Sequence, residues 1–185
     1  MQKELIICST LLIETSPQAL PLGAACIASA LKNDLLTKDK FEVKLISQSL
    51  EDFANKKIDD VALYFANILL EQNPKYLCFS VYVWNRNLIE QTAKVIKQKS
   101  ANIVIIAGGP EVTANPLSFE NFDYTISGAG EKSVPELINC LENNITNLPL
   151  GVYAKNCKIC SDRSVFPNLS ELSSPYLDGT LDVSE

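Results

Sequence analysis

Gly108, Gly109 and Pro110 directly follow residues 103–107 and are the first residues with the character of a binding site. Residues 103–107 form a continuous, β-branched apolar segment, which is typical of a strand buried on both faces of a parallel sheet. Glycines at the end of such a strand let the backbone turn sharply and let a ligand approach without an intervening Cβ. Ligands of open α/β sheets bind at this carboxyl edge. The same three residues can also serve only to end the strand.

Further candidate groups lie in other loops that we expect at the same edge. These loops fall within residues 10–23, 80–87, 108–115 and 128–132. Their aromatic, amide and hydroxyl side chains include Tyr82, Trp84, Asn85 and Thr113. With the glycines, such groups suit a large, flat, amide-rich ligand better than a small anion. Trp84 is equally compatible with a packed core position, and the Ser80 hydroxyl requires either a nearby backbone group or a pocket.

Several kinds of catalytic site are excluded by the residues that the sequence lacks. The chain contains no histidine, so a Ser/His pair and a histidine metal ligand are both unavailable. Neither a phosphate-binding Gly-x-x-x-x-Gly-Lys-Ser/Thr loop nor a Gly-x-Gly-x-x-Gly segment after the first strand is present. Cys157 and Cys160 form an isolated C-x-x-C, for which a structural role is favoured over a zinc or redox site. Zinc would need two more ligands, and a thioredoxin-like pair would lie at a strand-to-helix turn rather than in the expected hairpin.

The elements that position these groups alternate between strands and helices. The expected strands cover residues 4–9, 41–47, 76–83, 103–107 and 124–127. Apolar residues at helical spacing predict helices within residues 22–31, 58–69, 88–96 and 134–141, and Ser133 with Glu136 forms a capping box for the last one. This alternation predicts an α/β, Rossmann-like (flavodoxin-like) fold with a five-stranded parallel sheet, order 2-1-3-4-5, and helices on both faces. The ligand is expected over strands 1 and 3.

A change in composition after Pro149 divides the 185 residues into two parts. We assign residues 1–148 to the α/β domain and residues 149–185 to a β-hairpin, with its turn near Asn156, and a polar linker. This linker composition predicts that a longer protein continues past Glu185.

The overall composition restricts partners and location. The formal net charge of −6, without a Lys/Arg cluster, argues against binding to nucleic acid or to an anionic membrane. No signal peptide and no apolar stretch approaching the roughly 20 residues of a membrane span is present. We therefore expect a cytoplasmic protein.

The order of these motifs resembles the N-terminal cobalamin (B12)-binding domain of B12-dependent radical SAM proteins. The similarity covers nearly the whole chain and includes the segments 21–23, 80–82, 108–113 and 128–131, followed by the hairpin and by residues 174–177. The resemblance implies that Ser80, Gly108 and Gly109 border the dimethylbenzimidazole tail of cobalamin, while the loop 10–23 faces the corrin ring. The candidate cofactor-binding residues are Pro21, Leu22, Gly23, Ser80, Tyr82, Trp84, Asn85, Gly108, Gly109, Pro110, Thr113, Gly128, Gly130 and Glu131.

Two positions depart from the pattern of the wider cobalamin-domain superfamily. The superfamily's Asp-x-His-x-x-Gly aligns with this chain at Gly23, which places Gln18 at the Asp position and Leu20 at the His position. The resemblance therefore implies cobalamin held without a histidine ligand, as in other radical SAM relatives. The superfamily's Ser-x-Leu falls on Ser80-Val81-Tyr82, where the larger Tyr82 narrows the space for the nucleotide tail.

The resemblance also indicates which parts of a radical SAM enzyme this chain lacks. The Cys-x-x-x-Cys-x-x-Cys cluster motif is absent, so the [4Fe-4S] cluster and S-adenosylmethionine would belong to a downstream radical SAM barrel in the same full-length chain. This chain would bind and position cobalamin for a larger enzyme, such as a methyltransferase, rather than catalyse alone. Two alternatives stay open: a degenerate domain that binds no cofactor and acts as a scaffold, and a flavodoxin-like flavin or nucleotide binder.

Overall fold

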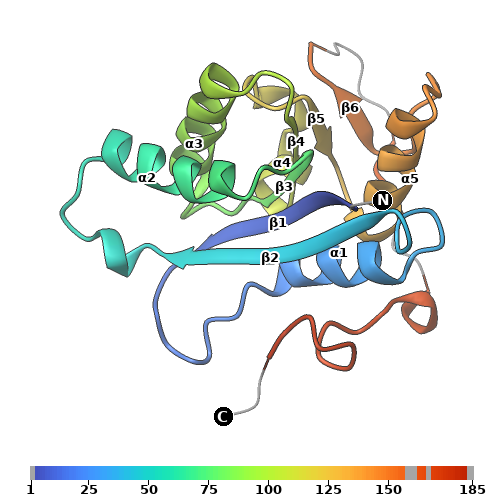
Figure 1. Ribbon diagram of the computed structural model, residues 1–185, viewed down its shortest axis with the longest axis horizontal. Helices are drawn as coiled ribbons and strands as arrows, with labels where there is room; N and C mark the ends of the chain where they lie inside the picture. The colour runs from blue at the N-terminus through green and yellow to red at the C-terminus, as the bar shows by residue number, and fades with distance from the viewer. Residues whose placement is uncertain (1–2, 157–161, 166–167, 183–185) are drawn as a thin grey trace.

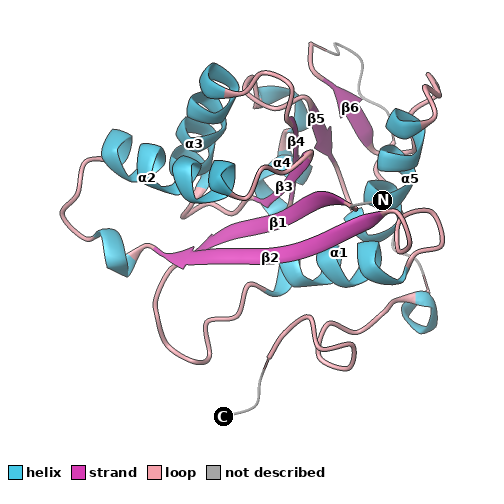
Figure 2. Ribbon diagram, in the orientation of Figure 1, coloured by secondary structure: helices cyan, strands magenta, loops and turns pink. Residues whose placement is uncertain are grey.

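The fold was analysed in a computed structural model, which describes residues 3–156, 162–165 and 168–182. Its sheet is built from β1 (Glu4–Leu12), β2 (Phe41–Ser49), β3 (Tyr76–Ser80), β4 (Val104–Gly108), β5 (Tyr124–Ile126) and β6 (Val152–Ala154). The helices are α1 (Leu22–Asn33), α2 (Ile58–Glu71), α3 (Arg86–Lys99), α4 (Pro110–Ala114) and α5 (Gly130–Glu142). Three short 3₁₀ turns cover Glu51–Phe53, Pro116–Ser118 and Leu169–Glu171. Figures 1 and 2 show the helices arranged around the central sheet.

The predicted α/β fold class is confirmed, with one strand more than expected. Strands β1 to β5 are parallel and follow the predicted order within the sheet β2-β1-β3-β4-β5-β6. The sixth strand, β6, pairs antiparallel with β5. It forms the first half of the predicted hairpin, whereas Cys157 and Cys160 lie outside the described residues. The chain turns toward β5 at Gly151, which has a φ of +78° and whose carbonyl accepts a hydrogen bond from Ser127 N at 2.8 Å.

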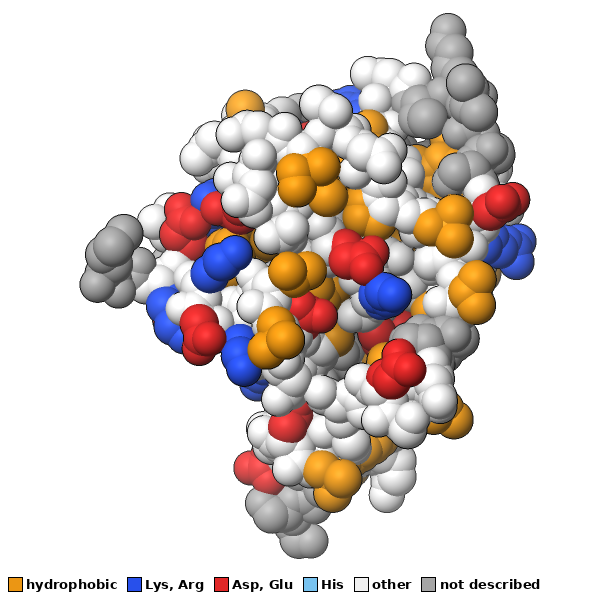
Figure 3. All heavy atoms as spheres, turned by 90° about the vertical axis from the view of Figure 1, so that its right-hand side faces the viewer, with side chains coloured by type: hydrophobic (Ala, Val, Ile, Leu, Met, Phe, Trp, Pro, Cys, Tyr) orange, Lys and Arg blue, Asp and Glu red, His pale blue; other side chains and the backbone are white. Residues whose placement is uncertain are grey.

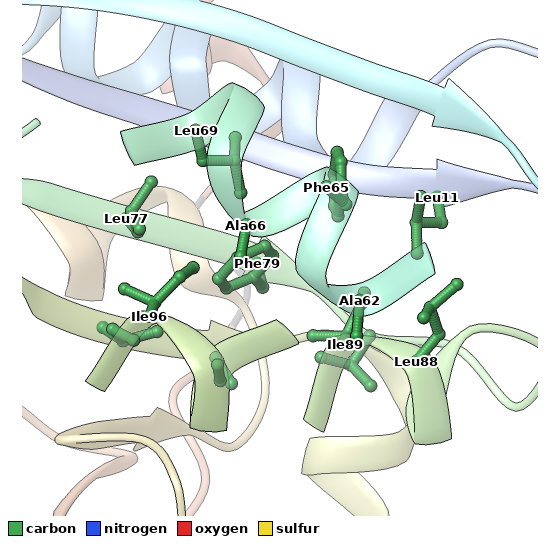
Figure 4. Close-up of a cluster of buried hydrophobic side chains, with 14 of the residues drawn as sticks. Leu11, Ala62, Phe65, Ala66, Leu69, Leu77, Phe79, Leu88, Ile89 and Ile96 are labelled. Carbon is green, nitrogen blue, oxygen red and sulfur yellow. The ribbon is translucent and has the colours of Figure 1, made fainter. Parts of the chain in front are cut away.

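The two faces of the sheet carry separate hydrophobic cores. Side chains from α2 and α3 cover one face, where Phe65 of α2 and Ile89 of α3 pack with Phe79 of β3 (Figure 4). Side chains from α1 and α5 cover the other face, where Ala28 and Leu137 pack near Ile106 of β4. Because neighbouring strand residues point to opposite faces, both faces are apolar and the central strands read as continuous hydrophobic segments.

Several predicted element boundaries were wrong, and two of them concern the loops that carry candidate residues. Helix α5 begins at Gly130, so Ser133 is buried inside the helix and is not its N-cap. The positive φ of Gly128 (+98°) turns the chain early enough for the helix to start there, and the Ser133 hydroxyl instead donates to the carbonyl oxygens of Ala129 (3.4 Å) and Leu150 (3.2 Å). Strand β3 ends at Ser80 rather than at residue 83.

Residues after β6 return to the α/β domain. Ser164 forms a parallel bridge with Gly128 and donates a backbone hydrogen bond to Ser127 O at 2.9 Å. Further along, Asp178 accepts hydrogen bonds from the side chains of Ser29 (2.6 Å) and Asn33 (2.8 Å) on α1. The segment that the composition marks as a linker is therefore attached to both α1 and the loop before α5, and Figure 1 shows it running beneath α1.

The surface is of mixed charge. On the face drawn in Figure 3, Lys and Arg side chains are interspersed with Asp and Glu. In the part of the chain that the structure describes, none of the helices has the length and apolar character that crossing a bilayer requires.

Candidate functional site

A cavity of about 210 Å³ opens at the carboxyl edge of the sheet, between the first turns of α1 and α5. Its inner walls are the apolar side chains of Ile27 on α1, Ile106 on β4, Ile126 on β5 and Val134 on α5. Many of the predicted binding residues also line it, namely Gly23, Ser80, Tyr82, Gly108, Gly109, Pro110, Gly128, Gly130 and Glu131. The structure therefore brings residues from four separate loops to one pocket.

Glycines shape this cavity in two different ways. Gly109 has a φ of +107°, and a Cβ there would lie 2.6 Å from the carbonyl oxygen of Val81, so the tight turn after β4 requires glycine. Gly108 is different, because a Cβ on it would have Ile126 Cβ at 4.0 Å as its nearest neighbour. A side chain at position 108 would therefore fit the fold and occupy cavity space.

Three polar groups face the otherwise apolar cavity. They belong to the lining residues Ser80 and Tyr82, which carry hydroxyls, and Glu131, which carries a carboxylate. Burial, with a further contribution from Cys26, raises the pKa of Tyr82, and the backbone N–H of Gly23 offsets part of that rise. Tyr82 is therefore a neutral phenol at pH 7. Such a cavity accepts a flat apolar group with a few hydrogen-bonding atoms.

Trp84 and Asn85 do not line the cavity but lie next to its mouth. The Trp84 ring stacks on Tyr82, with the ring centroids 4.5 Å apart and an interplanar angle of 6°, and Trp84 Nε1 donates to Leu11 O at 3.2 Å. Asn85 is fully buried, and its side chain accepts from Tyr82 N (2.8 Å) and donates to Leu11 O (3.1 Å). Asn85 thus joins the carboxyl ends of β1 and β3 and fixes the backbone that carries Tyr82.

Three other predicted residues also lie behind or beside the cavity lining. Thr113 Oγ1, on α4, accepts a hydrogen bond from Gly128 N at 3.0 Å and so connects the loops after β4 and β5. Pro21 immediately precedes α1, and Leu22 begins it with its side chain 44% exposed. The structure gives Thr113 a positioning role and leaves Leu22 on the surface near the mouth.

The prediction did not include the apolar inner wall of the cavity. Cys78 and Ile106 line the pocket, and each precedes a predicted residue, Ser80 or Gly108, by two positions on the same strand. Residues two apart on a strand share a face, so this spacing was the signal that could have identified them. Ile27 and Val134 come from helices, and their position in the pocket depends on helix packing that the sequence pattern does not specify.

The sheet order and the position of the cavity define a Rossmann-like α/β ligand-binding domain. A family model described as the B12 binding domain matches residues 9–138. The chain therefore belongs to the B12-binding domain family.

Similar curated proteins are methyltransferases of greater length. The chain is 30% identical over 119 residues to the "Cobalamin-dependent radical SAM methyltransferase TokK" of Streptomyces tokunonensis, a match that covers 59% of this chain and 17% of that protein. It is 29% identical over 119 residues to the "2-(S-pantetheinyl)-carbapenam-3-carboxylate methyltransferase" of Streptantibioticus cattleyicolor, covering 60% and 18%. An uncharacterized methyltransferase of Pyrococcus horikoshii is 26% identical over 167 residues, covering 85% and 33%. The chain thus spans a third or less of the length of these relatives.

Proposed function

We propose that this chain is the cobalamin-binding module of a larger B12-dependent radical SAM enzyme, and that the cavity receives the nucleotide tail of the cofactor. The observation that carries the proposal is the cavity at the carboxyl edge of the sheet, where glycines leave room for a ligand. The chain that contains it belongs to the B12-binding domain family. When bound, cobalamin supplies the cobalt chemistry, while this chain binds and orients the cofactor.

The fit of the tail rests on the chemistry of the cavity. The dimethylbenzimidazole group is flat and largely apolar, as are the walls formed by Ile106, Ile126 and Val134. Gly108 leaves the space that a Cβ would fill, and Ser80 would supply a hydroxyl that can hydrogen-bond a polar atom of the bound group. We therefore assign Ser80 and Gly108 to the tail.

The corrin ring is assigned to the surface around the cavity mouth. Four large apolar side chains in the loops after β1 and β3 and at the start of α1 are 44–74% exposed. They are Ile13, Leu22, Val83 and Trp84. Exposed apolar groups around a pocket are typical of a ligand-binding surface, and they suit the flat macrocycle.

Cobalt would be held without a histidine from this chain. The sequence has no histidine, and Leu20 occupies the position that carries it in the wider superfamily. We propose that the lower face of the corrin is covered by the loop 10–23 and the residues after β3, with no imidazole ligand from this chain.

The activity of the whole protein is proposed from its relatives. TokK is named as a cobalamin-dependent radical SAM methyltransferase, which supports a downstream barrel that holds the [4Fe-4S] cluster and S-adenosylmethionine. Residues 149–185 would then connect the cobalamin module to that barrel. Cobalamin and the barrel are the partners that this proposal assigns.

One observation favours the alternative of a scaffold that binds no cofactor. Tyr82 lines the cavity, and its hydroxyl lies against the backbone of Gly23 at the mouth. A tyrosine fixed there would keep the tail out, and the domain would then serve only to dock a partner.

An absorbance titration of the chain with hydroxocobalamin separates the two functions. The proposal predicts saturable binding and a base-off spectrum, because the tail leaves cobalt when it enters the cavity. Gly108→Val is expected to abolish binding, since its side chain takes up cavity space, while the exposed Ala101→Val is the matched control and binds as wild type. A folded wild-type chain that leaves the spectrum unchanged at high cobalamin would contradict the proposal and favour the scaffold.

A further inference from the structure

Tyr82 lines the cavity and reaches from the end of β3 to the start of α1. Its backbone follows the carboxyl end of β3, and its hydroxyl reaches Gly23 in the first turn of α1. We propose that Tyr82 is a specificity-determining residue that closes the cavity to the nucleotide tail and must rotate aside to admit it. This inference rests on the proposed function, because it concerns how the same cavity receives the cofactor.

The closed position of Tyr82 is held at both ends of its side chain. At the outer end, the hydroxyl lies against Gly23, and a Cβ on residue 23 would overlap that hydroxyl. Position 23 therefore has to be glycine for the tyrosine to lie here. Along its length, the Tyr82 ring stacks on Trp84 in a nearly parallel arrangement.

The backbone beneath the ring is fixed, so opening would involve the side chain alone. Asn85 is fully buried and accepts a hydrogen bond from Tyr82 N, and Trp84 is tied to Leu11 by its indole N–H. A rotation of the Tyr82 side chain breaks the stack and the polar contact with Gly23 but leaves these bonds intact. Tyr82 can therefore move without unfolding the end of β3.

The consequence is a difference between corrinoids with and without a nucleotide tail. A corrinoid that carries the tail must displace Tyr82, which lowers its affinity by the free energy of the lost contacts. A corrinoid without the tail binds the surface around the mouth and leaves Tyr82 in place. Tyr82→Leu introduces the leucine of the superfamily's Ser-x-Leu motif. It removes both the stack on Trp84 and the contact with Gly23.

Equilibrium binding of two probes tests this inference. Trp84 is the only tryptophan of the chain, so quenching of its fluorescence reports binding of hydroxocobalamin, which has the tail, and of diaquacobinamide, which lacks it. Relative to cobinamide binding, which shares any effect of the variant on Trp84, Tyr82→Leu is expected to tighten hydroxocobalamin binding about fivefold to tenfold, the cost of one stacked aromatic contact. The ratio of the two dissociation constants is the readout, and a merely structural role would not move it.

Two further variants control for folding and for the loss of any tyrosine. Tyr82→Phe keeps the ring and its stack and is expected to keep the wild-type ratio within about threefold. Tyr64→Leu removes a tyrosine that is 53% exposed on α2, and it should leave both affinities unchanged. An unchanged ratio in Tyr82→Leu, or weaker cobalamin binding with a normal cobinamide affinity, would overturn the role of Tyr82. If neither probe binds wild type or Tyr82→Leu, the cobalamin function itself fails, and this inference fails with it.

Discussion

The two faces of the sheet differ in how completely they are filled. On the face under α2 and α3, Phe79 packs edge-to-face on Phe122 (6.4 Å between ring centroids), and Phe122 packs on Phe119 (5.7 Å). On the opposite face, the strand positions nearest the carboxyl edge are Ser80 and Gly108, and the space above them is the cavity. Side-chain size at alternate positions along two strands therefore separates a structural face from a binding face.

The same face is filled at the other end of its strands. Near the amino edge, Tyr76 is buried and packs edge-to-face on Phe41, with 5.9 Å between the ring centroids. Its hydroxyl hydrogen-bonds Glu142 at the end of α5. Helix α5 is therefore fastened at its carboxyl end, while its first turn contributes Gly130 and Glu131 to the cavity. The binding face is therefore closely packed at its amino edge and contains the cavity at its carboxyl edge.

The largest effect on stability is expected from removing a buried side chain on the face that α2 and α3 cover. Phe65 on α2 has no exposed surface, and Phe65→Ala is expected to lower the free energy of unfolding by about 3–5 kcal/mol because it leaves a cavity among close-packed side chains. Urea denaturation followed by circular dichroism measures this. The exposed Tyr64→Ala on the same helix is the control and should cost less than about 1 kcal/mol. Equal losses in the two variants would contradict the difference in packing.

Adjacent residues on β4 provide a direct comparison of the faces. Ala107 is fully buried on the filled face, so Ala107→Val is expected to cost about 1–3 kcal/mol through overpacking. Gly108 faces the cavity, so Gly108→Val should change the free energy of unfolding by less than about 1 kcal/mol. The two variants are compared by chemical denaturation without ligand. A Gly108→Val protein that is the less stable of the pair would show that the cavity has no room for a side chain.

Much of this arrangement was predictable from the sequence, and the limits have physical causes. Continuous apolar segments such as residues 103–107 identified the parallel strands, their alternation with helices predicted a parallel sheet, and the order 2-1-3-4-5 expected for its first five strands is present in the structure. Strand β6 has only three residues, and its pairing depends on the turn at Gly151 rather than on a pattern of its own. The capping-box pattern at Ser133 was overridden by the turn at Gly128, since tertiary contacts decide between competing helix starts.

The candidate site was predictable as a set of loops but not as a set of roles. Gly108 and Ser80 were found because they follow or end buried strands, and both line the cavity. Asn85 is also polar, yet its amide forms hydrogen bonds with the backbone at the carboxyl ends of β1 and β3. Only the packed structure distinguishes a polar side chain that faces a cavity from one that holds the loop behind it.

The smallest effect is expected at the amino edge and depends on pH. Partial burial acts to raise the pKa of Glu142, but hydrogen bonds from Tyr76 and Lys75 outweigh it and hold the pKa below its usual range. Lys75 Nζ lies 2.9 Å from the Glu142 carboxylate. Because the pKa is depressed in the folded state, this stabilisation is present above the unfolded value of about 4.3 and is lost as the pH falls through the folded value.

Glu142→Gln should therefore lower the free energy of unfolding by about 1 kcal/mol at pH 7, and this loss should shrink as the pH falls below about 4.3 toward pH 3. Denaturation curves between these pH values measure the difference. The matched control is Glu136→Gln, because Glu136 forms only a long (3.9 Å) and largely exposed ion pair with Lys132. A wild-type and a Glu142→Gln protein with the same pH dependence would show that the negative charge of Glu142 adds no stability to this edge. The carboxyl end of α5 would then be held by neutral hydrogen bonds and by the apolar side chains beneath it.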